Sequence, residues 1–266
     1  MTHEMLDNSN QIYKDLYDTG KDRFTSLPYW HRSYSNWLKK ENDNLIKNTY
    51  NSYKRGTIIY IDFGVNVGSE ISGGHFAIVI TKNDNRKSSM LNVVPLTSKN
   101  KKFYLPIDKT VFENASNVLK QHLEDYIKNI QRKNDTLDEL TKEYDILYKE
   151  TKKEIDFYRE SDNVTIENYQ EIDDKISKLQ ATIDTQKEII KEIDKEKNMI
   201  EHVYRKYSNY DKQTFACYKS IQTVSKLKVR KINKFDPSGK MKVDNNTLDQ
   251  LDKKILTEYT NIKLTD

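Results

Sequence analysis

The sequence has 266 residues, with 45 basic and 41 acidic side chains, a net charge of +4 and 35% hydrophobic residues. The single cysteine, Cys217, excludes a disulfide framework and any metal site built from several cysteines, and it suits a reducing cytoplasm. The five histidines include no helix-spaced pair, so we expect no structural metal and no cofactor. No apolar run is long enough to span a bilayer, and the first residues lack the apolar segment of a secretory signal.

The first 53 residues are polar, and the aromatic pattern predicts one helix among them. Residues 27–44 begin near a proline and carry Trp30, Tyr34 and Trp37 at spacings of four and three, on one face of a helix. The simplest interpretation is that this face packs on the rest of the protein. The alternatives are a lid that occupies a groove as a built-in inhibitor, or a platform for base stacking.

From residue 54 the pattern changes to short strands separated by turns. Runs rich in β-branched and aromatic residues predict strands at 57–63, 75–81, 90–96 and 103–107. After a long interruption, similar runs return at 214–221 and 224–232, and a closing helix is expected at 248–260. In the run 224–234, lysines alternate with apolar residues, which places them on one face of a strand. That face is either a solvated outer surface or an RNA-binding wall.

The interruption has the 3.5-residue period of a coiled coil. Two heptad series are joined by a turn signal at residues 161–163 and predict an antiparallel helical hairpin over 115–206. Each arm of roughly 35–40 residues would be about 50–60 Å long. The series are Leu119, Leu123, Tyr126, Ile130, Leu137, Leu140, Tyr144 and Leu147, with Lys133 filling one slot, and Ile172, Ile176, Leu179, Ile183, Ile190, Ile193 and Ile200, with Gln186 and Lys197 as gaps.

The predicted organisation is therefore an α+β protein with an N-terminal helical segment at 1–53, a discontinuous barrel at 54–114 and 207–266, and the inserted hairpin. Charge follows the same division. Residues 115–206 hold 17 basic and 22 acidic side chains, whereas the rest of the chain holds 28 and 19. A basic barrel favours a polyanion such as nucleic acid, and an acidic hairpin is more suited to a spacer, a dimerisation arm or a protein-docking site.

The residues with chemical potential gather around two breaks in the strand pattern. Gly73 and Gly74 would let a substrate backbone approach closely, and His75 follows them at a strand start. A Thr-Ser pair, Thr97 and Ser98, closes a later strand. A histidine suits proton transfer at neutral pH, and hydroxyl groups can donate hydrogen bonds to a phosphate that gains charge.

Four motifs in this order resemble the MazF/PemK family of toxin endoribonucleases. They are the Arg-Gly pair at 55–56, the Gly-Ser-Glu loop at 68–75 before a hydrophobic strand, Pro-Leu-Thr-Ser at 95–98, and Ser-Ile-Gln-Thr-Val-Ser-Lys at 220–226. The resemblance covers roughly residues 54–110 and 212–265, and it leaves out the hairpin and the N-terminal helix. It implies a small SH3-like, MazF-like β-barrel.

The resemblance also implies an endoribonuclease that cleaves single-stranded RNA at specific sequences, without metal, by attack of the 2′-hydroxyl. The family's arginine falls on His75, which is the main departure, and its threonine falls on Thr97. The implied catalytic residues are thus His75, Thr97 and Ser98. The expected substrate-binding residues are Arg55, Glu70, Gly73, Gly74, Lys99, Thr223 and Lys226. Glu70 is better interpreted as a loop organiser, paired with Arg55, than as an acid.

Type II toxins imply a cognate antitoxin protein as a partner, and the family implies a homodimer. The competing interpretation is a non-catalytic binding module on the same barrel, which acts on a protein through the barrel or the hairpin. Histidine in the place of the arginine, together with the large insertion, favours this alternative. A purely structural coiled-coil role is the third.

Overall fold

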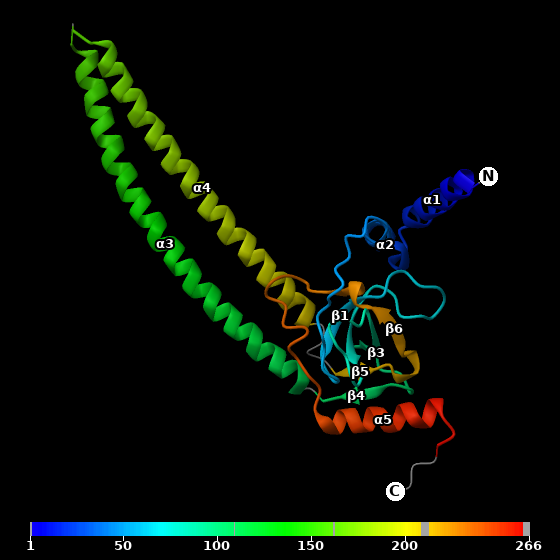
Figure 1. Ribbon diagram of the computed structural model, residues 1–266. Coiled ribbons are helices and arrows are strands. Elements are labelled where there is room, and N and C mark those ends of the chain that lie inside the picture. The colour runs from blue at the N-terminus through cyan, green and yellow to red at the C-terminus, as the bar shows by residue number, and fades with distance from the viewer. Residues whose placement is uncertain (1, 109, 162, 209–212, 263–266) are drawn as a thin grey trace. The chain divides into compact units, whose positions relative to one another are not determined.

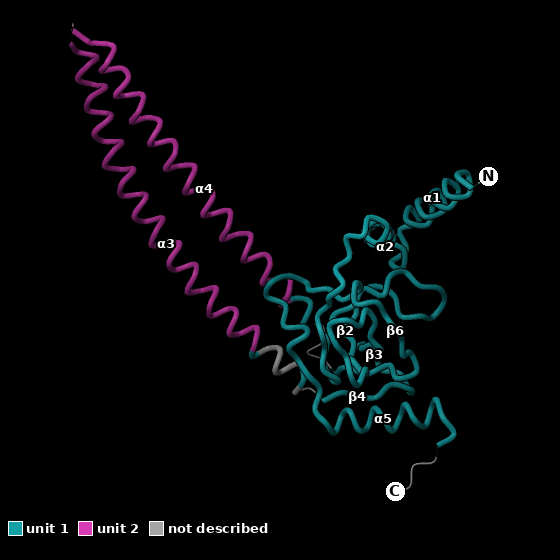
Figure 2. Tube along the Cα trace, viewed as in Figure 1, with its two compact units in different colours: residues 1–117, 205–266 teal, residues 118–204 magenta. Residues whose placement is uncertain are grey.

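The computed structural model describes residues 2–108, 110–161, 163–208 and 213–262 and shows an α+β protein (Figure 1). The chain divides into two compact units, one made of residues 1–117 and 205–266 and the other of residues 118–204 (Figure 2). The first unit contains an antiparallel sheet, and the second is a helical hairpin. No helix among the described residues combines the length and apolarity needed to cross a membrane.

The observed elements follow the predicted order. The helices are α1 (Thr2–Asp18), α2 (Leu27–Asn42), α3 (Thr110–Arg159), α4 (Ile166–Ser208) and α5 (Asn245–Tyr259). The strands are β1 (Ile58–Asp62), β2 (Gly74–Val79), β3 (Met90–Thr97), β4 (Leu105–Ile107), β5 (Thr214–Ala216), β6 (Gln222–Ser225) and β7 (Val229–Arg230), with short 3-10 turns η1 (Asp22–Phe24), η2 (Tyr218–Ser220) and η3 (Lys226–Lys228). Helix α1 and the three 3-10 turns were not expected, and the strand predicted over 214–221 is wrong in its second half, where η2 follows β5.

The sheet closes on itself because one chain segment pairs at both of its ends. β1, β2 and β3 form a meander, in which Ile58 pairs with Ile78 and Ala77 with Pro95. β6 then pairs with β3, and β7, which follows it through η3, pairs with the free edge of β1. β5 and β4 extend the other end of β3. Closure of this kind removes exposed strand edges and produces a small barrel.

Both faces of the central strands are buried, which explains their nearly continuous apolar sequences. One row forms the barrel interior and is drawn from β1, β2, β3 and β6: Ile59, Ile61, Phe63, Ala77, Val79, Leu91, Val93 and Val224. The alternate row, which includes Ile58, Phe76 and Ile78, is also fully buried. Tyr207, at the end of α4, packs on Phe76 with 4.9 Å between ring centroids and donates a hydrogen bond to Asp236 at 2.7 Å.

The hairpin is held by polar pairs between its two helices as well as by the apolar seam. Tyr126 donates to the Ile193 carbonyl at 3.2 Å. The residues that interrupt the predicted heptads form cross-helix contacts: Lys133 pairs with Glu192 at 2.8 Å, and Gln186 donates to Thr141 at 3.0 Å. These interruptions therefore form bonds that act only in one register, as polar seam residues do in coiled coils.

The predicted strand over 224–232 is wrong in its middle. β6 ends at Ser225, whose hydroxyl caps η3 by accepting from the Leu227 amide at 3.3 Å, and β7 has only two residues. The expected alternation of lysines on one face therefore fails. Lys226 is buried, Lys228 faces a groove, and Lys231 donates to the Asp236 carbonyl at 2.9 Å.

Candidate functional site

Antiparallel pairing brings His75 and Thr97 to the same mouth of the barrel. His75 lies at the start of β2 and Thr97 at the end of β3. Ala77 pairs with Pro95, and the same register continued by two residues sets His75 opposite Thr97. The His75 Nδ1 atom lies 3.1 Å from the Leu96 carbonyl oxygen. Both side chains continue the interior-facing row of their strands, so they lie at the edge of the apolar core.

The surroundings of His75 favour its neutral form. Burial lowers the pKa of His75, and the positive charges of Lys206 and Lys99 lower it further. Hydrogen bonding to the carbonyl oxygens of Leu96 and Ser72 opposes the change but does not reverse it. Because a carbonyl can only accept, the contact with Leu96 favours the neutral form that carries its hydrogen on Nδ1, and in this form Nε2 has a lone pair for a proton.

Thr97 has a hydroxyl that can still donate. Thr97 is 8% exposed, and its Oγ1 atom accepts from the backbone amide of Lys99 at 3.2 Å. Since that bond uses a lone pair, the hydroxyl hydrogen remains available for another acceptor. Ser98 and Lys99 are exposed beside it. The sequence therefore predicted a cluster that the structure assembles: His75, Thr97, Ser98 and Lys99.

A groove of about 670 Å³ lies at this mouth. One wall is the loop between β1 and β2, and the other is the turn η2 with the start of β6. The ring of Phe63 lines the groove and also packs edge-on against His75, with 6.4 Å between ring centroids. The remaining lining residues are Asn66, Val67, Ser69, Glu70, Ile71, Lys219, Ser220, Ile221, Gln222 and Lys228.

The loop wall has its own internal bonds. Gly73 has a φ of 81° and exchanges backbone hydrogen bonds with the β1 end, donating to Gly64 at 2.6 Å and accepting from Phe63 at 2.9 Å. Asn66 closes the loop by donating from Nδ2 to the Ile71 carbonyl at 2.7 Å. Gly74 is required for space, because a Cβ atom there would lie 1.9 Å from the Tyr60 hydroxyl.

Arg55 lies away from this cluster. It precedes β1, at the end of the strand opposite Phe63, and forms an ion pair with Asp252 of α5. Its Nε atom donates to the Ile80 carbonyl at 3.3 Å. The suggested pairing of Arg55 with Glu70 is therefore wrong: Glu70 is exposed in the groove loop, at the other mouth.

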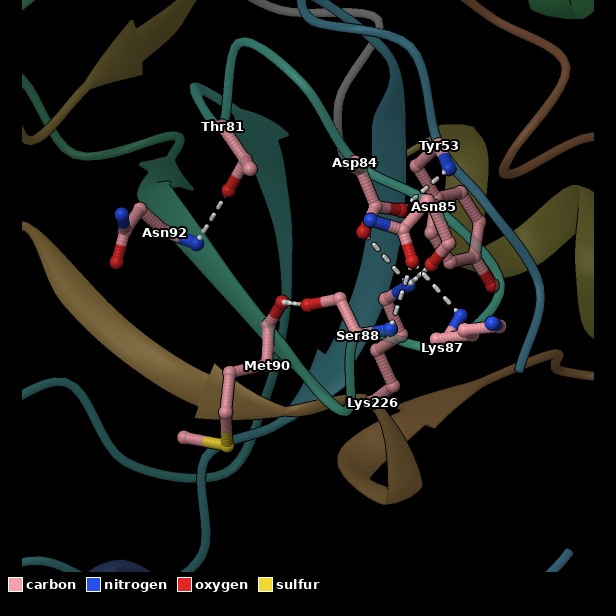
Figure 3. Close-up of polar contacts among 9 residues, drawn as sticks. All are labelled: Tyr53, Thr81, Asp84, Asn85, Lys87, Ser88, Met90, Asn92 and Lys226. Atoms are coloured by element: carbon pink, nitrogen blue, oxygen red, sulfur yellow. Dashed lines mark hydrogen bonds and ion pairs between the residues drawn. The ribbon is translucent and has the colours of Figure 1, made fainter. Parts of the chain in front are cut away.

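Lys226 is enclosed at the far mouth of the barrel, the one opposite to His75 and Thr97, as Figure 3 shows. Its side chain is 2% exposed and its Nζ atom lies 2.7 Å from Asp84, whose side chain is fully buried. The same ammonium donates to the Asn85 carbonyl at 2.9 Å, and Asp84 accepts from the Tyr53 amide at 2.8 Å. β3 spans seven residue steps from Met90, which is next to this pair, to Thr97, a distance of about 23 Å.

Thr223 is the last of the predicted binding residues. It is exposed on β6, pairs with Asn92, and donates to the Asn92 side chain at 2.6 Å. It does not line the groove, whereas its neighbour Gln222 does. The structure thus places Gly73, Gly74 and Lys99 near His75, puts Glu70 in the lining of the groove, and leaves Arg55, Thr223 and Lys226 elsewhere.

Sequence reasoning missed several residues of the site region. Phe63, Asn66, Gln222 and Lys228 line the groove, and Lys206 acts on His75 through its charge. Phe63 had been counted only as a strand residue, and nothing in the local sequence marks Lys206, because it ends a helix of the insertion. Within the part of the chain that the structure describes, no three His, Cys, Asp or Glu side chains are grouped to hold a metal ion.

Comparison with protein families gives one match. Residues 54–143 match the family model described as a PemK-like, MazF-like toxin of type II toxin–antitoxin systems. This part of the chain is PemK/MazF-like. The match includes β1 to β4, with His75 and Thr97, and ends inside α3, so it covers about a third of the chain and not β5 to β7. PemK/MazF toxins are generally endoribonucleases. A comparison with curated proteins returned no match.

Proposed function

We propose that the PemK/MazF-like barrel is an endoribonuclease that cleaves single-stranded RNA at specific sequences, without a metal ion. The observation that carries this proposal is that a half-buried His75, whose surroundings favour its neutral form, and the Thr97 hydroxyl lie at one mouth of the barrel, beside a groove with polar walls. The groove has the dimensions of a ligand site, and Phe63 belongs both to its lining and to the surroundings of His75.

In this proposal, His75 accepts the proton of the 2′-hydroxyl through Nε2. The 2′-oxygen then attacks the adjacent phosphorus, the bond from phosphorus to the 5′-oxygen breaks, and a 2′,3′-cyclic phosphate forms. The departing 5′-oxygen takes a proton from water or from Lys99. Thr97 and Ser98 donate hydrogen bonds to the phosphate oxygens as their charge increases.

The groove supplies binding rather than chemistry. Lys219 and Lys228 lie in its wall and can contact phosphates, and Asn66 and Gln222 have amide groups that can read base edges. Cations and amide groups are among the groups by which proteins bind the phosphates and the base edges of single-stranded RNA.

The test is incubation of the purified protein with a long single-stranded RNA in EDTA, beside the variants His75→Ala and Thr97→Ala. The matched control is His3→Ala, which removes an exposed histidine from α1. The proposal expects fragments with 2′,3′-cyclic phosphate ends from the wild type and the control. Both site variants should lose cleavage and still bind RNA. Intact RNA with the wild type, or unchanged cleavage by His75→Ala, would contradict it.

The partners follow from the same assignment. We infer that a cognate antitoxin protein restrains the toxin, that it acts in the cytoplasm on mRNA, and that the barrel forms a homodimer. A protein-binding function is the second candidate, and the hairpin tip favours it. Phe157, Ile166 and Tyr169 are exposed there by 67%, 74% and 65%. A wild type that leaves RNA intact would shift the assignment to this second candidate, with the tip as the surface to substitute first.

A further inference from the structure

The helix α2 and the turn η1 before it contact the first residues of the loop that walls the groove. Trp30 packs on Gly64 so closely that a Cβ atom at Gly64 would lie 2.3 Å from its Nε1 atom. Trp30 also stacks on Tyr34, with 5.7 Å between ring centroids. Just before α2, Arg23 donates to the Asn66 carbonyl at 2.7 Å.

Seven residues further along α2, Trp37 continues this contact. The Arg230 guanidinium lies 5.3 Å from the centre of the Trp37 ring and forms an ion pair with Asp62 at 3.1 Å. Asp62 in turn accepts from the Gly64 amide at 3.1 Å. An unbroken series of contacts thus leads from Trp37 through Arg230 and Asp62 to the residue on which Trp30 packs.

None of the groove's lining residues comes from α1 or α2. Helix α2 and the turn η1 therefore contact the groove loop without lining the groove. Asn66 shows the arrangement most clearly, because its carbonyl accepts from Arg23 while its side chain spans the loop and lines the groove. A lid that occupies the groove, one of the alternatives for this helix, does not fit these contacts.

We propose that α2 is a clamp that holds the groove loop, residues 64–73, in its RNA-binding shape, with Arg23, Trp30 and Trp37 as positioning residues. This inference rests on the proposed function for its substrate, although the clamp itself can be tested without RNA. Loosening the clamp should lower the fraction of molecules whose loop is competent to bind. The apparent KM then rises in inverse proportion to that fraction, while kcat at saturating RNA changes little.

Two matched pairs of variants test the clamp in the full chain. Gly64→Ala displaces Trp30, whereas Gly68→Ala adds the same methyl group at a similar positive φ with nothing within 4 Å. Arg23→Ala removes the bond to Asn66, whereas Arg32→Ala removes an exposed arginine from α2. The second pair keeps the test decisive if the first does not fold.

The RNA-free measurement is hydrogen exchange of the amides in residues 64–73, together with tryptophan emission. Trp30 and Trp37 are the only tryptophans in the sequence, so the emission reports the clamp directly. Gly64→Ala and Arg23→Ala should speed exchange in the loop and shift the emission to longer wavelength, and their controls should not. Equal exchange in each variant and its control would overturn the clamp.

The RNA measurement is the division of the effect between KM and kcat. A clamp that leaves one molecule in ten competent raises KM about tenfold with kcat within about twofold. Faster cleavage by Arg23→Ala would overturn the clamp and restore the inhibitor interpretation. Absence of cleavage by the wild type would contradict the proposed function alone, because the exchange comparison still decides whether α2 holds the loop.

Discussion

The ion pair of Lys226 with Asp84 gives a sharp test of where the RNA surface ends. The sequence placed Lys226 among the RNA-binding residues, whereas the structure encloses it with a fully buried carboxylate. The perturbation is Lys226→Met, which keeps most of the side-chain volume and removes the charge. The companion change is Asp84→Asn, whose amide oxygen can still accept from the Tyr53 backbone amide.

The size of the effect follows from burial. Each single variant leaves one charge inside the protein without its partner, which destabilises the fold by about 3–5 kcal/mol. The double variant leaves no charge unpaired and loses mainly the bond to the Asn85 carbonyl, so its cost should stay below about 2 kcal/mol. The coupling energy of the pair is then at least about 4 kcal/mol.

The assay is urea unfolding followed by tryptophan fluorescence. Both tryptophans lie on α2, which contacts the barrel, so the signal reports that unit and not the hairpin. Lys219→Met is the control, since its ion pair with Glu258 is exposed by 37% and 36%, and breaking such a pair costs about 0–1 kcal/mol. Affinity for RNA, measured per folded molecule, should not change in Lys226→Met.

One result would refute this reasoning. If Lys226→Met unfolds at the same urea concentration as Lys219→Met and binds RNA more weakly than the wild type, the lysine is not committed to Asp84. The far mouth of the barrel would then belong to the RNA surface. A double variant as unstable as the sum of the singles would refute the pairing itself.

Three further predictions concern other parts of the chain. Because the pKa of His75 is lowered, the acid limb of kcat/KM should have its midpoint below pH 6.5, and a pH–rate profile with a midpoint above 6.5 would contradict the assigned base. As the pH falls, the unfolded state binds a proton at His75 before the folded state does, so the free energy of unfolding decreases below pH 6.5. Urea midpoints measured from pH 7 to 5 should show this decrease. Burial raises the pKa of Cys217 to about 11, so a thiol reagent should label it only at the rate of unfolding; rapid labelling of the folded protein would show an open site. Gln186→Leu places an apolar side chain in the seam and removes the hydrogen bond to Thr141, and it should stabilise the hairpin by about 1 kcal/mol. The gain should appear as a higher melting temperature in far-ultraviolet circular dichroism. A lower melting temperature would mean that the hydrogen bond stabilises the hairpin more than apolar packing at this position does.

The strands and the hairpin could be predicted because the pattern of buried side chains in each element appears in the sequence as a pattern of apolar residues. Residues 57–63 are apolar at nearly every position since both faces of β1 are covered, and the heptads of α3 and α4 follow their common seam. α1 was missed for the opposite reason. None of its residues is buried, so no strong apolar pattern marks it, although Met5, Ile12 and Leu16 recur at helical spacing.

The site was only partly predictable. A sequence motif shows which residues are close along the chain, but it does not show at which mouth of the barrel they lie. In an antiparallel meander, the end of β1, the start of β2 and the end of β3 meet at one mouth. That rule unites Phe63, His75 and Thr97. It sends Arg55, which precedes β1, and Lys226, which follows the β6 end paired with the start of β3, to the other mouth.

The position of the insertion explains how a small barrel accommodates so long a hairpin. β4 and β5 pair directly, with Leu105 opposite Ala216, although the insertion separates them in the chain. A flexible connection of about 100 residues would oppose this pairing with a closure entropy of roughly 4 kcal/mol. An antiparallel helical hairpin returns the chain to within about 10 Å of where it left, because paired helices lie 8–10 Å apart. The inserted hairpin therefore joins the two pairing strands as a short connection does, although it separates them widely in the sequence.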